Sequence, residues 1–140
     1  MNKAFLPVIF LLTFISILGF LLSLNFPDLD ISILGIGMHR FFLFHSAIIP
    51  LFFYIAIKLL FKPKRNIEIL ITTFCGSFTF GVGIHLFLDI FQSKAIIFPF
   101  IGSLINGTST DDRIWLTVNV LICFIFSILL YKKIIKSLGL

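Results

Sequence analysis

Four long apolar segments, separated by short polar ones, dominate the chain. Each is about 20 residues long, which is the length of an α-helix that crosses the hydrocarbon core of a bilayer, about 30 Å thick. The segments are Phe5–Leu24, Phe41–Phe61, Ile67–Phe91 and Ile114–Tyr131. The pattern predicts an all-α, polytopic membrane protein whose four transmembrane helices pack as a bundle.

A fifth apolar segment, Ala95–Asn106, is shorter than the other four and contains Pro99 and Gly102. It is too short to cross a bilayer, so we expect a re-entrant or interfacial segment there. Lys3 before the first apolar segment is a feature of secretory signals, but that segment is longer than a usual signal and no small-x-small cleavage site follows it. We therefore expect a retained first helix and a single transmembrane helical domain over residues 1–140.

Composition supports the membrane interpretation and excludes several other classes of protein. Hydrophobic residues make up 59% of the chain and charged residues only 12%, with a mean hydropathy of +1.17, whereas a soluble domain has about twice that charged fraction. The net charge of +5 comes from basic residues at the ends of apolar segments, which argues against nucleic-acid binding. Cys75 and Cys123 lie inside apolar segments without CxxC spacing, which argues against a disulfide framework and a thiolate metal site.

The basic residues also predict the orientation of the chain. Cytoplasmic loops of membrane proteins carry the excess of Lys and Arg. We therefore expect both termini in the cytoplasm, the protein in the inner (cytoplasmic) membrane, and membrane lipid as its partner. Eight of the eleven basic residues fall on one predicted side: Lys3, Lys58, Lys62, Lys64, Arg65, Lys132, Lys133 and Lys136.

Small and polar residues indicate how the helices pack. Small residues four apart let neighbouring backbones approach closely inside a membrane, and the third segment has three such pairs, so we expect it at the centre of the bundle. In the last segment we expect Trp115 to anchor the membrane interface and Asn119 to hydrogen-bond to another helix. The small pairs are Thr72 and Gly76, Ser77 and Gly81, and Thr79 and Gly83.

Three polar blocks interrupt the apolar pattern, and the predicted topology brings all three to the outer side of the membrane. Ionisable groups near a bilayer are costly and mark functional sites. Imidazole nitrogens and carboxylate oxygens together suit zinc, with manganese and iron as alternatives, so we expect some of these residues to bind a divalent metal ion. The candidate ligands are Asp28 and Asp30, then His39 and His45, then His85 and Asp89, the last two on one helical face.

The two histidines of the middle block bear on where the second helix begins. Six positions correspond to about 240° around a helix, so His39 and His45 cannot share a face, and we expect the helix to begin between them. Pro50 leaves the carbonyl of Ser46 without its usual donor, an irregularity that is tolerated where it lines a polar cavity.

Each of these residues also has an ordinary structural explanation. Asp28 would cap a turn, His45 would be a hydrogen-bonded packing residue, and Arg40 would be an interfacial anchor whose charge snorkels to water. His85 and Asp89 would form a structural hydrogen-bonded pair.

In these polar blocks the chain resembles the membrane-bound metal-dependent hydrolases of the YdjM-like type, and more closely a short subgroup of them. The resemblance implies a hydrolase whose metal is held by the aspartates and histidines, and Ile31 stands where many members have a further histidine. The matching residues, in order, are Pro27, Asp28 and Asp30; His39, Arg40, His45 and Ser46; Gly81, His85 and Asp89; and Pro99 and Phe100.

These observations lead to one functional hypothesis and one alternative. A bound metal would lower the pKa of a coordinated water toward about 7, Asp30 would act as general base, and Arg40 would bind an anionic group of the substrate. Because the site opens at the membrane interface, we expect a lipid or lipid-linked (phospho)ester as substrate. The alternative is a non-catalytic small membrane protein that uses the same cluster for ion or proton transport or for assembly of a membrane complex.

Overall fold

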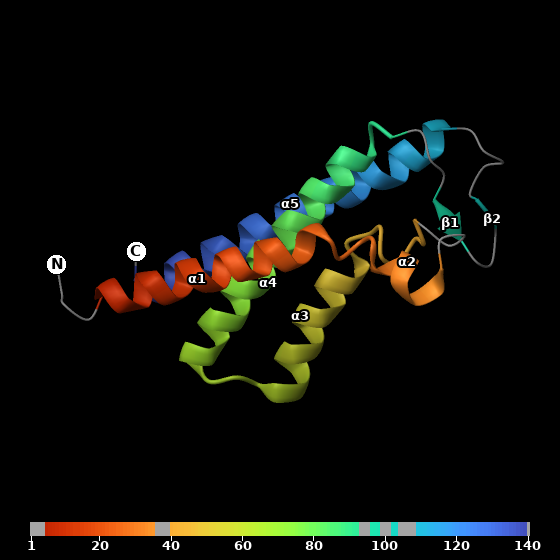
Figure 1. The fold of residues 1–140 in the computed structure, drawn as a ribbon. Coiled ribbons are helices and arrows are strands. Elements are labelled where there is room, and N and C mark those ends of the chain that lie inside the picture. The colour runs from red at the N-terminus through yellow and green to blue at the C-terminus, as the bar shows by residue number, and fades with distance from the viewer. Residues whose placement is uncertain (1–4, 36–39, 93–95, 99–101, 104–108, 140) are drawn as a thin grey trace.

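The computed structural model describes residues 5–35, 40–92, 96–98, 102–103 and 109–139, and within them the chain is almost entirely helical (Figure 1). This agrees with the predicted all-α class, apart from two strands of two residues each. The helices are α1 (Phe5–Leu24), α2 (Leu29–Leu34), α3 (Ile48–Phe61), α4 (Arg65–Asp89) and α5 (Ser109–Leu138), and the strands are β1 (Ile97–Phe98) and β2 (Gly102–Ser103).

Three helices are long and apolar enough to cross a membrane, and they make the chain a membrane protein by length and composition. They cover Leu6–Leu24 of α1, Arg65–Asp89, and Arg113–Leu138 of α5. The helix α3 has 14 residues, fewer than the about 20 that a membrane span needs, so only three of the four predicted spans have their expected length.

The start of α3 differs from the prediction. The helix begins at Ile48, after both histidines, and not between His39 and His45. Two side chains take the backbone donors at this start: Asn119 Oδ1 accepts from Ala47 N at 2.9 Å and Ser46 Oγ accepts from Ile48 N at 3.2 Å. Residues 40–47 form turns because the N–H groups of Phe41, Phe42 and Ala47 donate to distant segments and not along a helix.

The helix α4 packs against α1, α3 and α5, as the small residues predict. At Gly81 an added Cβ would overlap Ser23 Oγ of α1, and at Gly83 it would lie 2.9 Å from the Phe124 ring of α5. Ser127 Oγ also donates to the Gly76 carbonyl at 2.8 Å, a close hydrogen bond between α5 and α4. The glycines therefore set the separation of these helices.

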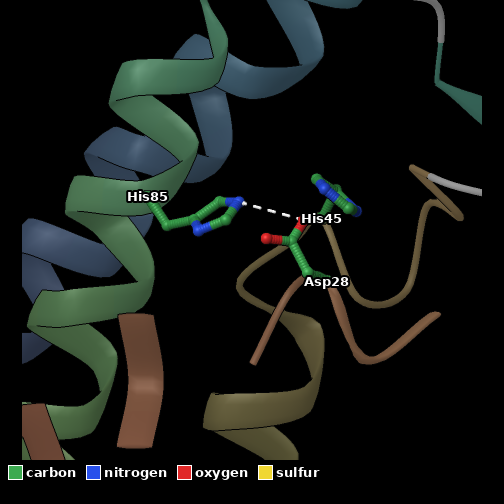
Figure 2. A group of neighbouring side chains, drawn as sticks. All are labelled: Asp28, His45 and His85. Carbon is green, nitrogen blue, oxygen red and sulfur yellow. Dashed lines mark ion pairs between the residues drawn. The ribbon is translucent and has the colours of Figure 1, made fainter. Parts of the chain in front are cut away.

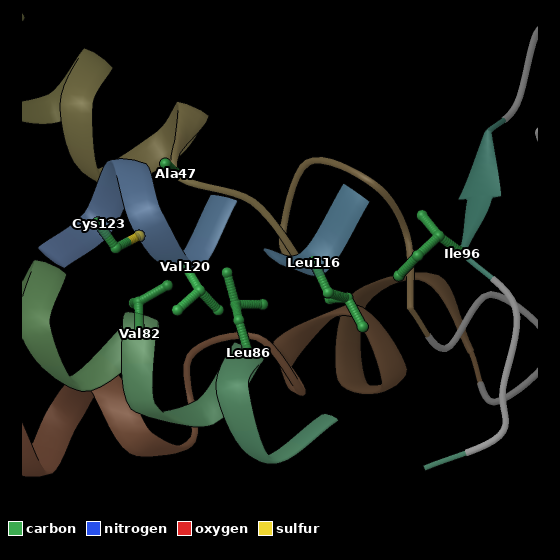
Figure 3. Packing of buried hydrophobic residues seen from close by; sticks show 7 residues of the cluster. All are labelled: Ala47, Val82, Leu86, Ile96, Leu116, Val120 and Cys123. Carbon is green, nitrogen blue, oxygen red and sulfur yellow. The ribbon is translucent and has the colours of Figure 1, made fainter. Parts of the chain in front are cut away.

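A cluster of buried apolar side chains joins α4, α5 and the turn before α3. Val82 and Leu86 of α4 face Leu116, Val120 and Cys123 of α5 (Figure 3). Phe26 and Phe42 pack on this cluster from segments that carry two of the polar blocks, and Trp115 packs on it from α5. The packing thus fixes the backbone from which the polar residues project.

The strands β1 and β2 lie in the predicted fifth segment, and its other residues are outside the described part apart from Ile96. They pair antiparallel, with Ile97 opposite Ser103. Ile97 also bridges to the turn before α3: its carbonyl accepts from Phe42 N at 3.1 Å and its N–H donates to the Arg40 carbonyl at 3.0 Å. This pairing holds Arg40 at φ 71, a left-handed conformation that is uncommon for a residue other than glycine.

Candidate metal centre

The structure brings together five of the six predicted ligands, from four separate elements. Asp28 lies in the turn after α1, Asp30 in α2, His45 in the turn before α3, and His85 and Asp89 in the last turns of α4 (Figure 2 shows three of them). The sixth, His39, lies outside the described residues.

The donor atoms of this cluster have the separations of ligands around one ion. The Nε2 atoms of His45 and His85 lie 3.4 and 3.5 Å from Asp89 Oδ2, and His85 Nε2 lies 3.7 Å from Asp28 Oδ1. Tetrahedral ligands about 2.1 Å from zinc lie about 3.4 Å from one another. Asp28, His45 and His85 each offer an atom within 4.8 Å of the other two, so this cluster could hold a metal ion.

The other nitrogen of each imidazole faces an oxygen. His85 Nδ1 lies 2.7 Å from the Leu24 carbonyl, and His45 Nδ1 lies 3.3 Å from Asp30 Oδ2. Histidines that bind metals usually donate this second N–H to a carbonyl or carboxylate, which orients the ring and fixes its tautomer. Leu24 and Asp30 occupy the positions of such partners.

The hydrogen bond to Leu24 has a consequence for the charge of His85. A carbonyl oxygen only accepts, so His85 Nδ1 carries the proton, and Nε2 of the neutral ring is an acceptor. That acceptor faces two carboxylate oxygens, of Asp28 and Asp89, and Asp89 Oδ2 is buried without a hydrogen bond among the described residues. A cation between these acceptors, either a second proton on His85 or a metal ion, would stabilise them.

The charge of the cluster favours a bound cation. Among the described residues, the cluster contains the three carboxylates of Asp28, Asp30 and Asp89 and the guanidinium of Arg40. Neighbouring carboxylates repel one another when ionised, and a divalent ion among them would offset this repulsion.

Arg40 and Asp30 are placed differently from their predicted roles. Arg40 is only 1% exposed, and its Nη2 donates to Asp89 Oδ1 at 3.0 Å and to Gln92 Oε1 at 3.1 Å. Asp30 is fully buried, and its Oδ2 accepts from Phe41 N at 2.9 Å. Because both side chains are buried and engaged, the geometry argues against Arg40 as the binder of a substrate anion and against Asp30 as general base. Arg40 instead positions Asp89, and Asp30 positions His45.

The cluster is open on one side. The side chain of Asp28 is 44% exposed and that of His85 16%, whereas His45 and Asp30 are fully buried. A ligand would therefore approach at Asp28 and His85.

Two residues of the last helix support the site in ways that the sequence only partly predicts. Asn119 makes the expected hydrogen bond to another segment, at Ala47 N. Trp115, expected as an interfacial anchor, donates from Nε1 to the His45 carbonyl at 3.0 Å. Gln92, the partner of Arg40, has no signal in the sequence, because it follows the helix that carries the recognisable pair.

Comparisons with models of protein families, with curated proteins and with solved structures find no match for this chain. The resemblance to YdjM-like hydrolases therefore rests on the matching residues alone.

Proposed function

We propose that the protein is a membrane-bound metal-dependent hydrolase, with Asp28, His45, His85 and Asp89 holding a divalent metal ion, zinc first, and manganese or iron as alternatives. The observation that supports this best is the approach of His85 Nε2 to two carboxylate oxygens, which a cation would stabilise. A cation held by two imidazoles and carboxylates is typical of catalytic zinc sites.

The residues around the ion would have separate roles. A divalent ion in such a site supplies Lewis acidity and a water that ionises near neutral pH. Asp28, on the open side, would be the ligand that an approaching substrate meets first. Asp30 and the Leu24 carbonyl keep the imidazoles oriented, and Arg40 holds Asp89.

The proposal includes the predicted topology and substrate. Helix α3 together with the turns of residues 40–47 would form the fourth span in the inner membrane, and both termini would be cytoplasmic, as the basic residues favour. The site then opens outward at the membrane interface, where a lipid or lipid-linked (phospho)ester is the substrate to test first.

Metal analysis of protein purified in detergent without chelators tests the site. We expect about one equivalent of metal in the wild type, and its loss in His85→Ala and in Asp28→Asn, whose side chain is exposed enough to change without unfolding the chain. Glu68→Gln, a carboxylate change at the other end of α4, is the matched control and should keep its metal. A wild type without metal would mean that a proton on His85 balances the carboxylates and would overturn the proposal.

Hydrolysis is tested separately with the metal-loaded protein. Bis(p-nitrophenyl) phosphate and detergent-solubilised phosphatidylglycerol serve as soluble and lipid esters, and turnover should disappear in Asp28→Asn. Metal binding without turnover of either ester would favour the non-catalytic alternative.

One observation favours the assembly form of that alternative. Asp30, Arg40 and His45 are at most 1% exposed and tie two segments, α2 and the turn before α3, to the end of α4, as a structural lock would. Transport is less well supported, because α4 carries no charged residue between Glu68 and His85.

A further inference from the structure

A cavity of about 430 Å³ lies at the opposite end of the molecule from the proposed metal site, here called the His/Asp cluster (Asp28, His45, His85 and Asp89). It is formed where α1 and α4 begin and α5 ends, and Figure 1 shows the start of α1 and the end of α5 at this end. The volume falls in the range of cavities that bind small ligands, about 300 to 1,000 Å³. The proposed hydrolase does not use this cavity.

The lining of the cavity is polar at one side and apolar at the other. Arg65 and Asn66 begin α4, and Ser137 is the last but one residue of α5. Leu11 and Leu12 of α1 and Ile69 of α4 lie further along the apolar spans. Since a helix rises 1.5 Å per residue, Ile69 is about 6 Å deeper than Arg65. A ligand that fills the cavity therefore has a polar group at the membrane surface and an apolar part below it.

Arg65 has no acidic partner among the described residues. Its only hydrogen bond there is from Nη2 to the Ser137 carbonyl, at 2.6 Å, so most donors of the guanidinium remain for a ligand. The nearest acid in sequence, Glu68, pairs with Lys58 and with Lys133, the latter at 2.6 Å. The guanidinium is therefore an uncompensated positive charge at the mouth of the cavity.

The surroundings of the cavity are strongly basic. Seven basic residues and one acid, Glu68, lie at this end, which gives a local charge of +6. Such basic pockets at the cytoplasmic ends of transmembrane helices bind the headgroups of anionic lipids. The seven are Lys58, Lys62, Lys64, Arg65, Lys132, Lys133 and Lys136.

We infer that this cavity binds one anionic phospholipid. The phosphate lies at Arg65, Asn66 and Ser137, and an acyl chain follows Leu11, Leu12 and Ile69 toward the bilayer. The apolar wall is open to the surroundings, because Leu11 is 44% exposed, so a lipid enters sideways from the membrane. A soluble anion would leave the apolar wall unused, and a neutral lipid would leave Arg65 uncompensated.

Native mass spectrometry of the full chain with defined lipids tests this inference. At 0.15 M salt, added phosphatidylglycerol should give a one-to-one complex that phosphatidylcholine at the same concentration does not give. Arg65→Gln should lower the affinity for phosphatidylglycerol about tenfold, since a charge-assisted hydrogen bond is lost. Leu12→Trp, which fills the apolar part, should lower it without any change of charge.

The matched controls are Lys132→Gln and Leu21→Trp. Lys132 is an exposed basic residue at the same end that does not line the cavity, and Leu21 is an exposed residue of α1 away from it. Lys132→Gln should weaken binding no more than about threefold, because salt screens exposed charges, and Leu21→Trp should not change it.

Three results would overturn the inference. The first is an equal loss of affinity for phosphatidylglycerol in Lys132→Gln and Arg65→Gln. The second is binding of phosphatidylcholine as strong as that of phosphatidylglycerol. The third is full displacement of the lipid by glycerol 3-phosphate, which would indicate a site that binds the anion but no acyl chain. The metal content is measured on the same samples, so failure of the lipid site is separate from failure of the proposed metal site.

Discussion

The two ends of α4 hold charge in opposite ways. At Asp89 the carboxylate is buried against Arg40, which is 1% exposed, and the side chains of Gln92 and His45 lie beside the pair. At Glu68 the carboxylate meets Lys58 and Lys133, whose side chains are 32% and 41% exposed. The difference shows that one helix supports a largely buried polar site at one end and a solvated basic surface at the other.

Replacing Asp89, the buried carboxylate at the end of α4, should have the largest effect on stability. Asp89→Asn leaves Arg40 buried without its carboxylate, and breaking a buried pair costs about 3 to 5 kcal/mol. We expect a lower free energy of unfolding by that amount, measured by denaturant titration in detergent micelles. If Asp89→Asn were as stable as the wild type, the pair would not be buried as described.

Disturbing the close packing of α1 against α4 should have the next largest effect on stability. Gly81→Ala places a methyl group against Ser23 Oγ and 3.1 Å from the Phe20 carbonyl, so α1 must move away from α4, at a cost of about 1 to 3 kcal/mol. Gly76→Ala is the control, because its Cβ would meet only ordinary contacts from 3.5 Å. Equal unfolding free energies for the two variants would contradict this packing.

The orienting carboxylate should affect metal binding without being a ligand. Asp30→Asn removes the charge facing His45 Nδ1, and loss of such a partner typically lowers metal affinity 10- to 100-fold. Chelator competition on the purified variant measures the change. Complete loss of metal at any concentration would instead make Asp30 a ligand, and an unchanged affinity would remove it from the site.

Replacing Glu68, the carboxylate at the solvated end of α4, should have a smaller effect on stability. Glu68→Gln removes one carboxylate from partly exposed pairs, and such pairs contribute at most about 1 kcal/mol. The same denaturant titration should show a small loss that shrinks further at high salt. A loss as large as that of Asp89→Asn would mean that the two ends do not differ as described.

The sequence predicts the helices well where hydrophobicity decides them. The bounds of α1 agree at both ends, and α4 begins and ends two residues before the predicted Ile67 and Phe91. The helix α5 extends beyond Ile114–Tyr131 at both ends, because hydropathy detects the part within the membrane and not the polar turns that continue the helix.

The site shows where such prediction stops. The positions of charged residues suffice to bring His45, His85 and the aspartates to one end of the molecule. The separate roles of the site residues cannot be predicted from the sequence. They depend on contacts such as that of Arg40 with Asp89, 49 residues away, and of Ile97 with the turn that carries Arg40. Local patterns carry no information on these distances.

The shortness of α3 has a consequence for the membrane itself. Its 14 residues span about 21 Å, against about 30 Å for the hydrocarbon core. In the proposed four-span topology this hydrophobic mismatch must be relieved by local thinning of the bilayer or by water that enters above the helix. In the proposed function, either response would lower the water boundary toward the metal site, and a lipid ester would then meet its open side at Asp28 and His85 without leaving its leaflet.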